Sequence, residues 1–132
     1  MKQTSSQGRF VYKYYEKNRH EYEKLLQIAL KQKTRDRLFV FVYLSDKLSL
    51  TSDLALELIY RFPKKIVVVA REKGDEMKIS LRSRGVPVKG ALEKALVGVQ
   101  GFGGGHENAC GATVKKPDFE KFLEQLRQNI SD

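Results

Sequence analysis

The stretch from Gly101 to Val114 holds the residues of this chain whose types and spacing could form a binding site. Three consecutive glycines, Gly103 to Gly105, have no side chains and can adopt positive φ, so a ligand can approach their N–H groups closely. His106 follows directly and could donate a hydrogen bond to a phosphate or a base. The sequence therefore predicts an anion-binding loop at a bend of the chain.

Other interpretations of this segment are open. The glycines could simply form a flexible connection between a helix and a strand, and His106 could be an ordinary surface histidine. His106 and Cys110 together make a poor zinc site, because zinc takes at least three ligands from the protein. No base is placed to activate Cys110, so we interpret it as a small buried residue.

Charge and composition narrow the class of partner. The 132 residues carry 25 Lys and Arg against 16 Asp and Glu, a net charge of +9, which favours an anionic partner such as nucleic acid or an acidic protein. A single cysteine excludes an internal disulfide, and the N-terminal residues do not resemble a signal peptide. The longest apolar run, Leu38 to Leu44, is too short to span a bilayer. We expect a cytoplasmic protein with no membrane partner.

The elements that must position the glycine–histidine segment include two strong strands. Leu38–Leu44 is β-branched and aromatic throughout, which predicts a strand buried on both faces in the middle of a sheet. Ile66–Ala70 predicts a second buried strand, and the alternating Met77–Arg82 predicts a hairpin with it. This alternation places Ser80 and Arg82 on one surface of the sheet.

Apolar residues at helical spacing predict four amphipathic helices, over residues 18–33, 50–62, 88–97 and 119–130. The segment Arg9 to Tyr15, which mixes aromatic and basic side chains, is interpreted as an edge strand or extended arm. A stacking platform for single-stranded nucleic acid is the alternative for that segment. The fold class that follows is α/β, a single domain with a mixed sheet and helices packed on its faces.

Two motifs in this order resemble a known family. Ser-Leu-Arg-Ser at 80–83 is followed by a helix, by Gly-Gly-Gly-His-Glu-Asn-Ala-Cys-Gly-Ala at 103–112, and by a last helix. The arrangement is similar to the DHH-associated domain 1, the C-terminal substrate-binding half of DHH-family phosphoesterases such as RecJ-type exonucleases, with a related version in alanyl-tRNA synthetase. Cys110 departs from the pattern, where an alanine is expected. The resemblance covers about residues 38–130 and implies a nucleic-acid-binding domain over residues 38–132; the residues before it, 1–37, are interpreted as an N-terminal arm and amphipathic helix.

The resemblance also implies which residues bind. In the family, the glycine–histidine loop and the arginine of the Ser-x-Arg-Ser strand hold nucleic acid against the catalytic domain. Carried over by position, the binding residues here are Arg82, Gly103, Gly104, Gly105 and His106, with Ser80 and Asn108 as further candidates. The family's catalytic Mn²⁺ or Mg²⁺ is held by Asp and His side chains of the separate DHH domain. This chain has two histidines, His20 and His106, and no Asp-His-His triplet, so we expect no catalytic residue and no cofactor of its own.

The function that we expect is binding of single-stranded DNA or RNA without catalysis by this chain alone. The chain could be a stand-alone accessory to a DHH catalytic protein, or the C-terminal fragment of a complete phosphoesterase or exonuclease. A hypothesis of another class is a protein-interaction subunit of a replication, repair or RNA-processing assembly.

Overall fold

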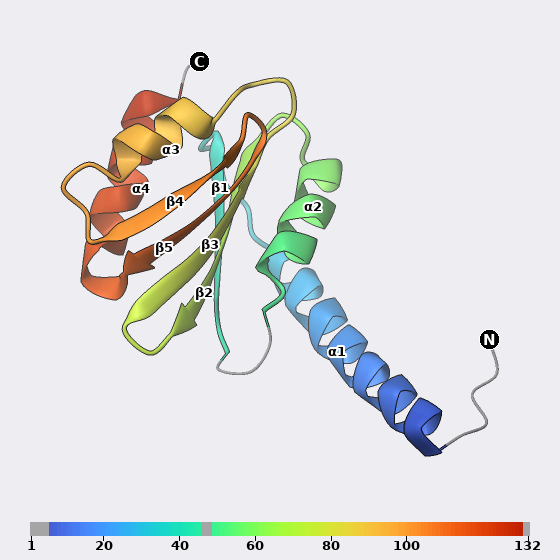
Figure 1. Cartoon of the computed structure of the whole chain (residues 1–132). Helices are drawn as coiled ribbons and strands as arrows, with labels where there is room; N and C mark the ends of the chain where they lie inside the picture. Colours follow the sequence, from blue (N-terminus) through green and yellow to red (C-terminus); the bar gives the residue numbers. More distant parts are fainter. Residues whose placement is uncertain (1–5, 46–48, 131–132) are drawn as a thin grey trace. The chain divides into compact units, whose positions relative to one another are not determined.

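Five strands form one mixed sheet in the computed structural model, which describes residues 6–45 and 49–130, with side chains from residue 18 onward. The strand order across the sheet is β1-β2-β3-β5-β4. Strand β1 is parallel to β2, and every other neighbouring pair is antiparallel. The strands are β1 (Leu38–Leu44), β2 (Ile66–Lys73), β3 (Glu76–Arg82), β4 (Gly101–His106) and β5 (Ala109–Lys115) (Figure 1). The predicted α/β class with a mixed sheet is confirmed.

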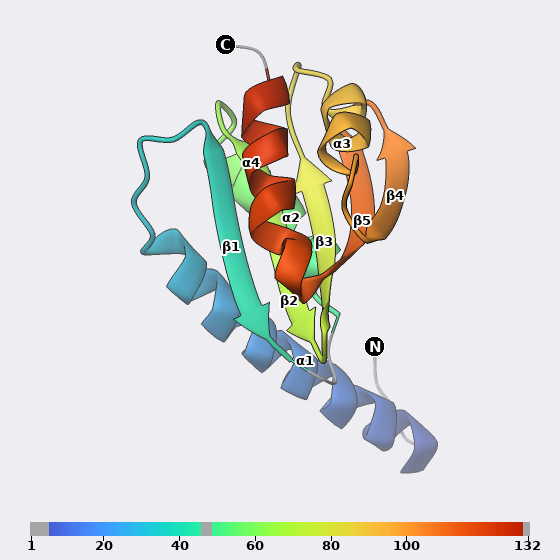
Figure 2. The ribbon, with the colours of Figure 1, turned by 90° about the vertical axis from the view of Figure 1, so that its left-hand side faces the viewer.

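Helices cover both faces of this sheet. Figure 2 shows α3 (Lys89–Ala95) and α4 (Phe119–Asn129) on one face and α2 (Thr51–Arg61) on the other. The core lies between the sheet and α3 and α4, where Phe122 and Leu126 are fully buried. Burial of one such side chain contributes about 1.5–3 kcal/mol to folding. Within the described ranges, no helix is both long and apolar enough to cross a membrane.

Helix α1 (Ser6–Leu30) belongs to a separate unit of the chain, which ends at Gln32. The interpretation of Arg9–Tyr15 as a strand or extended arm is wrong, because this segment lies within α1. After Gly8 the helix contains no Gly or Pro to interrupt it, and extending an existing helix adds a hydrogen bond for each residue fixed. A modest β preference of a few aromatic residues does not outweigh that propagation.

Strand β1 lies at an edge of the sheet, so its predicted place in the middle is wrong. One of its faces is nevertheless buried, because Phe39 stacks on Phe62 and the Tyr43 hydroxyl accepts a hydrogen bond of 2.9 Å from the Leu50 N–H. Its other face opens toward the C-terminal end, where Leu44 is 73% exposed. An apolar run indicates that the faces of a strand are covered. The position of the strand in the sheet depends instead on which other strands pair with it.

The other predicted elements lie close to their expected places. Strands β2 and β3 form the predicted hairpin, and its turn contains Gly74 with a φ of +62°. Helix α4 begins after a short 3₁₀ turn, Lys116–Asp118, which contains Pro117. Strands β3 and β4 finish at one end of the sheet, and β5 begins at that same end. Residues far apart in sequence therefore meet at that end.

Candidate nucleic-acid interface

Part of one sheet face carries no covering helix within residues 33–130 of the described fold. Helix α2 packs on β2 and β3, and the same face of β5 and β4 is left open. Residues directly paired between antiparallel strands point to one face, so the register defines the rows of this surface. We call it the open face, and its residues are Lys78, Arg82, Phe102, Gly104, His106, Ala109, Gly111 and Thr113.

Arg82 and His106 share one row of the open face. Arg82 pairs with Ala109, and Ala109 pairs with His106. Two inter-strand spacings separate the two backbones, roughly 10 Å. The residue between them carries only a methyl group, so nothing bulky fills the space between the guanidinium and the imidazole. His106 is exposed and Arg82 is half-buried, which leaves both side chains available to a ligand.

The glycine triplet is part of strand β4 and not a loop, so the predicted anion-binding loop is wrong in its backbone form. Two of the three glycines allow β4 to pack closely against β5. A Cβ on Gly103 would lie 2.7 Å from the Cβ of Ala112, and a Cβ on Gly105 would lie 2.8 Å from the Cα of Cys110. Carbon atoms essentially never approach so closely, so these two positions require glycine for strand pairing.

Gly104 is the glycine of the triplet that opens onto the candidate site. A Cβ placed on Gly104 would meet no atom within 4 Å, and the residue pairs with Gly111 on β5. The row of Gly104 and Gly111 lies between the row of Arg82 and His106 and the row of Thr113 and Phe102. Because neither glycine has a side chain, this row is a bare floor of backbone atoms. A flat ligand group can contact this floor directly.

Ser80 does not reach the exposed surface, although it lies on the same sheet face as Arg82. Its hydroxyl donates a hydrogen bond of 2.9 Å to Thr51 Oγ1 and lies 3.2 Å from Ser52 Oγ. These contacts tie β3 to the first turn of α2. Ser80 is 6% exposed, so its part in the site is to hold α2 at the border of the open face.

Asn108 lies in the turn between β4 and β5, and its side chain is engaged by the neighbouring loop. Its amide Nδ2 donates hydrogen bonds of 3.1 Å to Ser83 Oγ and 3.0 Å to the Val86 carbonyl. Its own carbonyl accepts the Ser83 N–H at 3.1 Å. Asn108 therefore positions the loop that follows Arg82.

Two further residues belong to this region that the sequence motifs did not single out as binding residues. Phe102 is 69% exposed at the far row of the open face, and alternation along β4 with Gly104 and His106 is the signal that could have found it. Arg84, in the loop after β3, holds its guanidinium 5.8 Å from the centre of the Tyr60 ring. This contact could not be predicted from the sequence, because it forms only where the fold brings α2 and the loop together.

Cys110 faces the core, on the side of the sheet opposite to the open face. It is 7% exposed, and its thiol donates a hydrogen bond of 3.1 Å to the His106 carbonyl. Burial raises the pKa of the Cys110 thiol. The interpretation as a small buried residue is confirmed. Among the described side chains, no three of His, Cys, Asp or Glu are grouped so that they could hold a metal ion.

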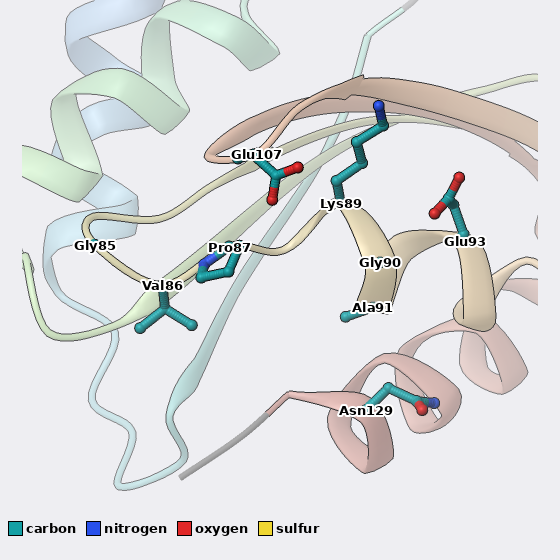
Figure 3. A pocket seen from close by; sticks show the side chains of 9 residues that line it. All are labelled: Gly85, Val86, Pro87, Lys89, Gly90, Ala91, Glu93, Glu107 and Asn129. Atoms are coloured by element: carbon teal, nitrogen blue, oxygen red, sulfur yellow. The ribbon is translucent and has the colours of Figure 1, made fainter.

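A cavity of about 610 Å³ lies on the helix side of the same end of the sheet. Figure 3 shows its lining, whose charged side chains are Lys89, Glu93 and Glu107. One cation against two carboxylates does not favour a phosphate. This cavity is therefore a weaker candidate for an anion than the open face.

Solved structures with the same fold come from several proteins. The C-Ala domain of Aquifex aeolicus alanyl-tRNA synthetase has a TM-score of 0.60 and 21% identity, with 77% of this chain and 99% of that chain covered. RecJ from Thermus thermophilus, in complex with Mg²⁺, has a TM-score of 0.76 and 16% identity, with 92% of this chain and 19% of that chain covered. CDC45 from Entamoeba histolytica has a TM-score of 0.58 and 12% identity, with 85% and 27% covered.

This chain thus spans about a fifth of the length of the RecJ structure and nearly all of the C-Ala domain. No curated protein sequence matches the chain. The family description "DHHA1 domain" matches residues 38–132, well over half of the chain and all five strands of the sheet. The resemblance inferred from the two sequence motifs is confirmed. The chain belongs to the DHHA1 domain family, which is related to the DHH-family phosphoesterases and to the C-Ala domain of alanyl-tRNA synthetase.

Proposed function

We propose that the open face binds single-stranded DNA or RNA and that this chain does not cleave the strand by itself. The observation that carries the proposal is the row Arg82–Ala109–His106 beside the bare row of Gly111 and Gly104. A guanidinium and an imidazole can both donate hydrogen bonds to phosphate oxygens, while the bare row lets the sugar-phosphate chain approach the sheet.

The third row of the open face supports the same ligand. The exposed ring of Phe102 offers a surface on which a base can stack, a contact worth about 1–3 kcal/mol in single-strand binding proteins. Arg82 adds positive charge at the border of the open face with α2, whereas the charge of Lys78 is paired with the carboxylate of Glu76 at 3.4 Å. Two of the structural neighbours are named as an exonuclease and as a domain of a tRNA synthetase, which is consistent with a nucleic-acid ligand.

The proposal that this chain does not cleave nucleic acid by itself rests on the metal-ligand side chains that it offers. One structural neighbour is named as the exonuclease RecJ bound to manganese. The donor set of this chain does not fit such an ion, because the described residues offer no group of three His, Cys, Asp or Glu side chains. We infer that any hydrolysis requires a DHH catalytic domain, in another protein or elsewhere in a longer chain. Hydrolysis of an oligonucleotide in Mn²⁺ that co-purifies with this chain and disappears in His106→Ala would contradict this.

Fluorescence anisotropy of a labelled single-stranded oligonucleotide tests the binding site. Arg82→Ala should weaken binding about 10- to 150-fold, because a charge-assisted hydrogen bond contributes about 1.5–3 kcal/mol. His106→Ala should weaken binding as well. Lys94→Ala is the matched control, since it removes one exposed cation from α3, on the opposite side of the sheet, and should bind like wild type.

Salt dependence separates phosphate contacts from other binding. For a single strand, log K should fall against log salt with a slope of about −0.7 per phosphate bound. Arg82→Ala should therefore reduce the steepness of the slope by about 0.7. If folded Arg82→Ala and His106→Ala both bind like wild type, the proposal is wrong. The open face would then be assigned to a protein partner in a replication, repair or RNA-processing assembly.

A further inference from the structure

A second basic surface lies at the same end of the sheet as Arg82 and His106. It is a cavity of about 260 Å³ formed where three element ends converge. Arg37 directly precedes β1, Lys64 and Lys65 directly precede β2, and Arg84 follows β3. The convergence is a result of topology, because β1 and β2 are parallel and begin at the end where the antiparallel β3 finishes. We call this cavity the basic pocket.

The charges of the basic pocket are all of one sign. Its lining contains Arg37, Lys64, Lys65 and Arg84 and no acidic residue. The Lys65 ammonium is fixed in place, since it donates hydrogen bonds to the carbonyl oxygens of Thr34 and Asp36. Like charges held close together repel one another, and a bound anion would remove that repulsion. The larger cavity of Figure 3 differs in this respect, since its lining carries two carboxylates.

The acidic side chain that neighbours the basic pocket is already neutralised. The Asp36 carboxylate accepts a hydrogen bond of 2.9 Å from Arg127 Nε and another of 3.2 Å from the Leu38 N–H. It therefore has its own cation and does not balance Arg37, Lys64 or Arg84. Between residues 33 and 130, those three side chains form no ion pair in the described structure.

The wall that carries Arg84 is fixed before any ligand binds. Ser83 Oγ donates a hydrogen bond to the Val86 carbonyl and accepts one from Asn108, and Gly85 adopts a φ of +80° that suits glycine. Arg84 lies over the ring of Tyr60, a cation–π contact that holds the guanidinium. Tyr60 is 67% exposed, so its ring also offers a surface to a base.

We propose that the basic pocket binds a phosphate group of the same single strand that the open face holds, so that the strand continues from Arg82 past Arg84 toward Arg37 and Lys64. This inference rests on the proposed function for the identity of the ligand, while the pocket's preference for phosphate rests on its own four cations. Arg82 of the open face and Arg84 of the basic pocket are two residues apart on one chain, which places the two surfaces next to each other. The pocket extends the binding surface by at least one phosphate.

The first experiment uses inorganic phosphate as the probe and reads backbone amide shifts by NMR. Saturable shifts are expected at Ser83, Arg84 and Ile66, because these residues line the basic pocket. The double variant Arg37→Ala/Lys64→Ala should abolish them, whereas Arg82→Ala should leave them. Absence of saturable shifts, or shifts that survive in the double variant, would overturn the proposal.

The second experiment measures anisotropy of a long single-stranded oligonucleotide against salt. The double variant should reduce the steepness of the salt slope by about 0.7 for each phosphate that the pocket no longer binds. The control variant Lys94→Ala should keep the wild-type slope. If the double variant keeps the wild-type slope while Arg82→Ala lowers it, the pocket proposal fails and the open face stands. If neither Arg82→Ala nor His106→Ala has an effect, the proposed function fails independently of what inorganic phosphate does.

Discussion

The side-chain amide of Asn108 donates a hydrogen bond of 3.1 Å to the hydroxyl of Ser83, which joins the turn between β4 and β5 to the loop that follows β3. Ser83 lies between Arg82 on the open face and Arg84 in the basic pocket. Together with the bonds from the Asn108 amide to the Val86 carbonyl and from the Ser83 N–H to the Asn108 carbonyl, this hydrogen bond holds the segment that carries both arginines against the turn after His106. We expect Asn108 to act by positioning this segment.

Asn108→Ala should lower the free energy of unfolding by about 1–2 kcal/mol, because the variant cannot form the two hydrogen bonds of the amide. Oligonucleotide binding should weaken, yet the salt slope should stay unchanged because no charge is removed. Chemical denaturation and anisotropy at several salt concentrations measure the two effects. Glu107→Ala, at the neighbouring exposed turn position, is the control for stability. A wild-type unfolding free energy for Asn108→Ala would contradict the positioning role.

Gly103→Ala and Gly104→Ala form a matched pair that separates packing from binding. Gly103→Ala should destabilise the fold by about 1–3 kcal/mol, because its Cβ would overlap the Ala112 side chain and the Gly111 carbonyl. Gly104→Ala should change stability little, since its Cβ would point into open space. Thermal unfolding compares the two variants, and equal melting temperatures would show that the collision at Gly103 is relieved. In the binding assay, Gly104→Val should fold and should weaken oligonucleotide binding, because it covers the bare floor.

The Cys110 thiol should react slowly with alkylating reagents in the folded protein. Burial raises its pKa, so at any neutral pH the thiolate fraction is smaller than in the unfolded chain, and the side chain is also shielded from the reagent. The rate of modification at neutral pH in buffer, compared with the rate in denaturant, checks this. Equal rates would mean that the strand pair β4–β5 opens readily. Cys110→Ala should retain oligonucleotide binding, since this side chain faces the core.

Asp36→Asn should lower the melting temperature at neutral pH, with an effect that disappears in acid. Burial acts to raise the pKa of the Asp36 carboxyl, but hydrogen bonds from the Leu38 amide and Arg127 outweigh it and hold the pKa below its ordinary value. A carboxyl of this kind stabilises the fold above its ordinary pKa of about 3.9, and the stabilisation disappears as the pH falls through the lower folded value. Melting curves from neutral pH down to that range measure it.

The pair partner provides the control for this pH effect. Arg127→Ala removes the same hydrogen bond from the other side, so the double variant should be little less stable than either single variant. Additive destabilisation in the double variant would show that Asp36 and Arg127 stabilise the fold through different contacts.

Much of this fold could be predicted from local patterns. Alternation along Met77–Arg82 places Ile79 in the core and Arg82 on the opposite face, and this periodicity needs no information beyond the sequence. The apolar stripes of α2 and α4 are equally local, because helical spacing by itself brings their side chains to one face. The two motifs also predicted the family, which the match over residues 38–132 confirmed.

The tertiary structure decided what depends on a partner elsewhere in the chain. Strand β1 became an edge strand because pairing, and not hydrophobicity, sets strand order. Gly103 and Gly104 look alike in the sequence, but they differ once β5 lies beside β4, because one faces Ala112 and the other faces open space. Contact with helix α2 buries Ser80. The cations of the basic pocket come together because the ends of three elements converge there. Local sequence determines which side chains alternate along an element, whereas a site forms only where distant elements bring their side chains together.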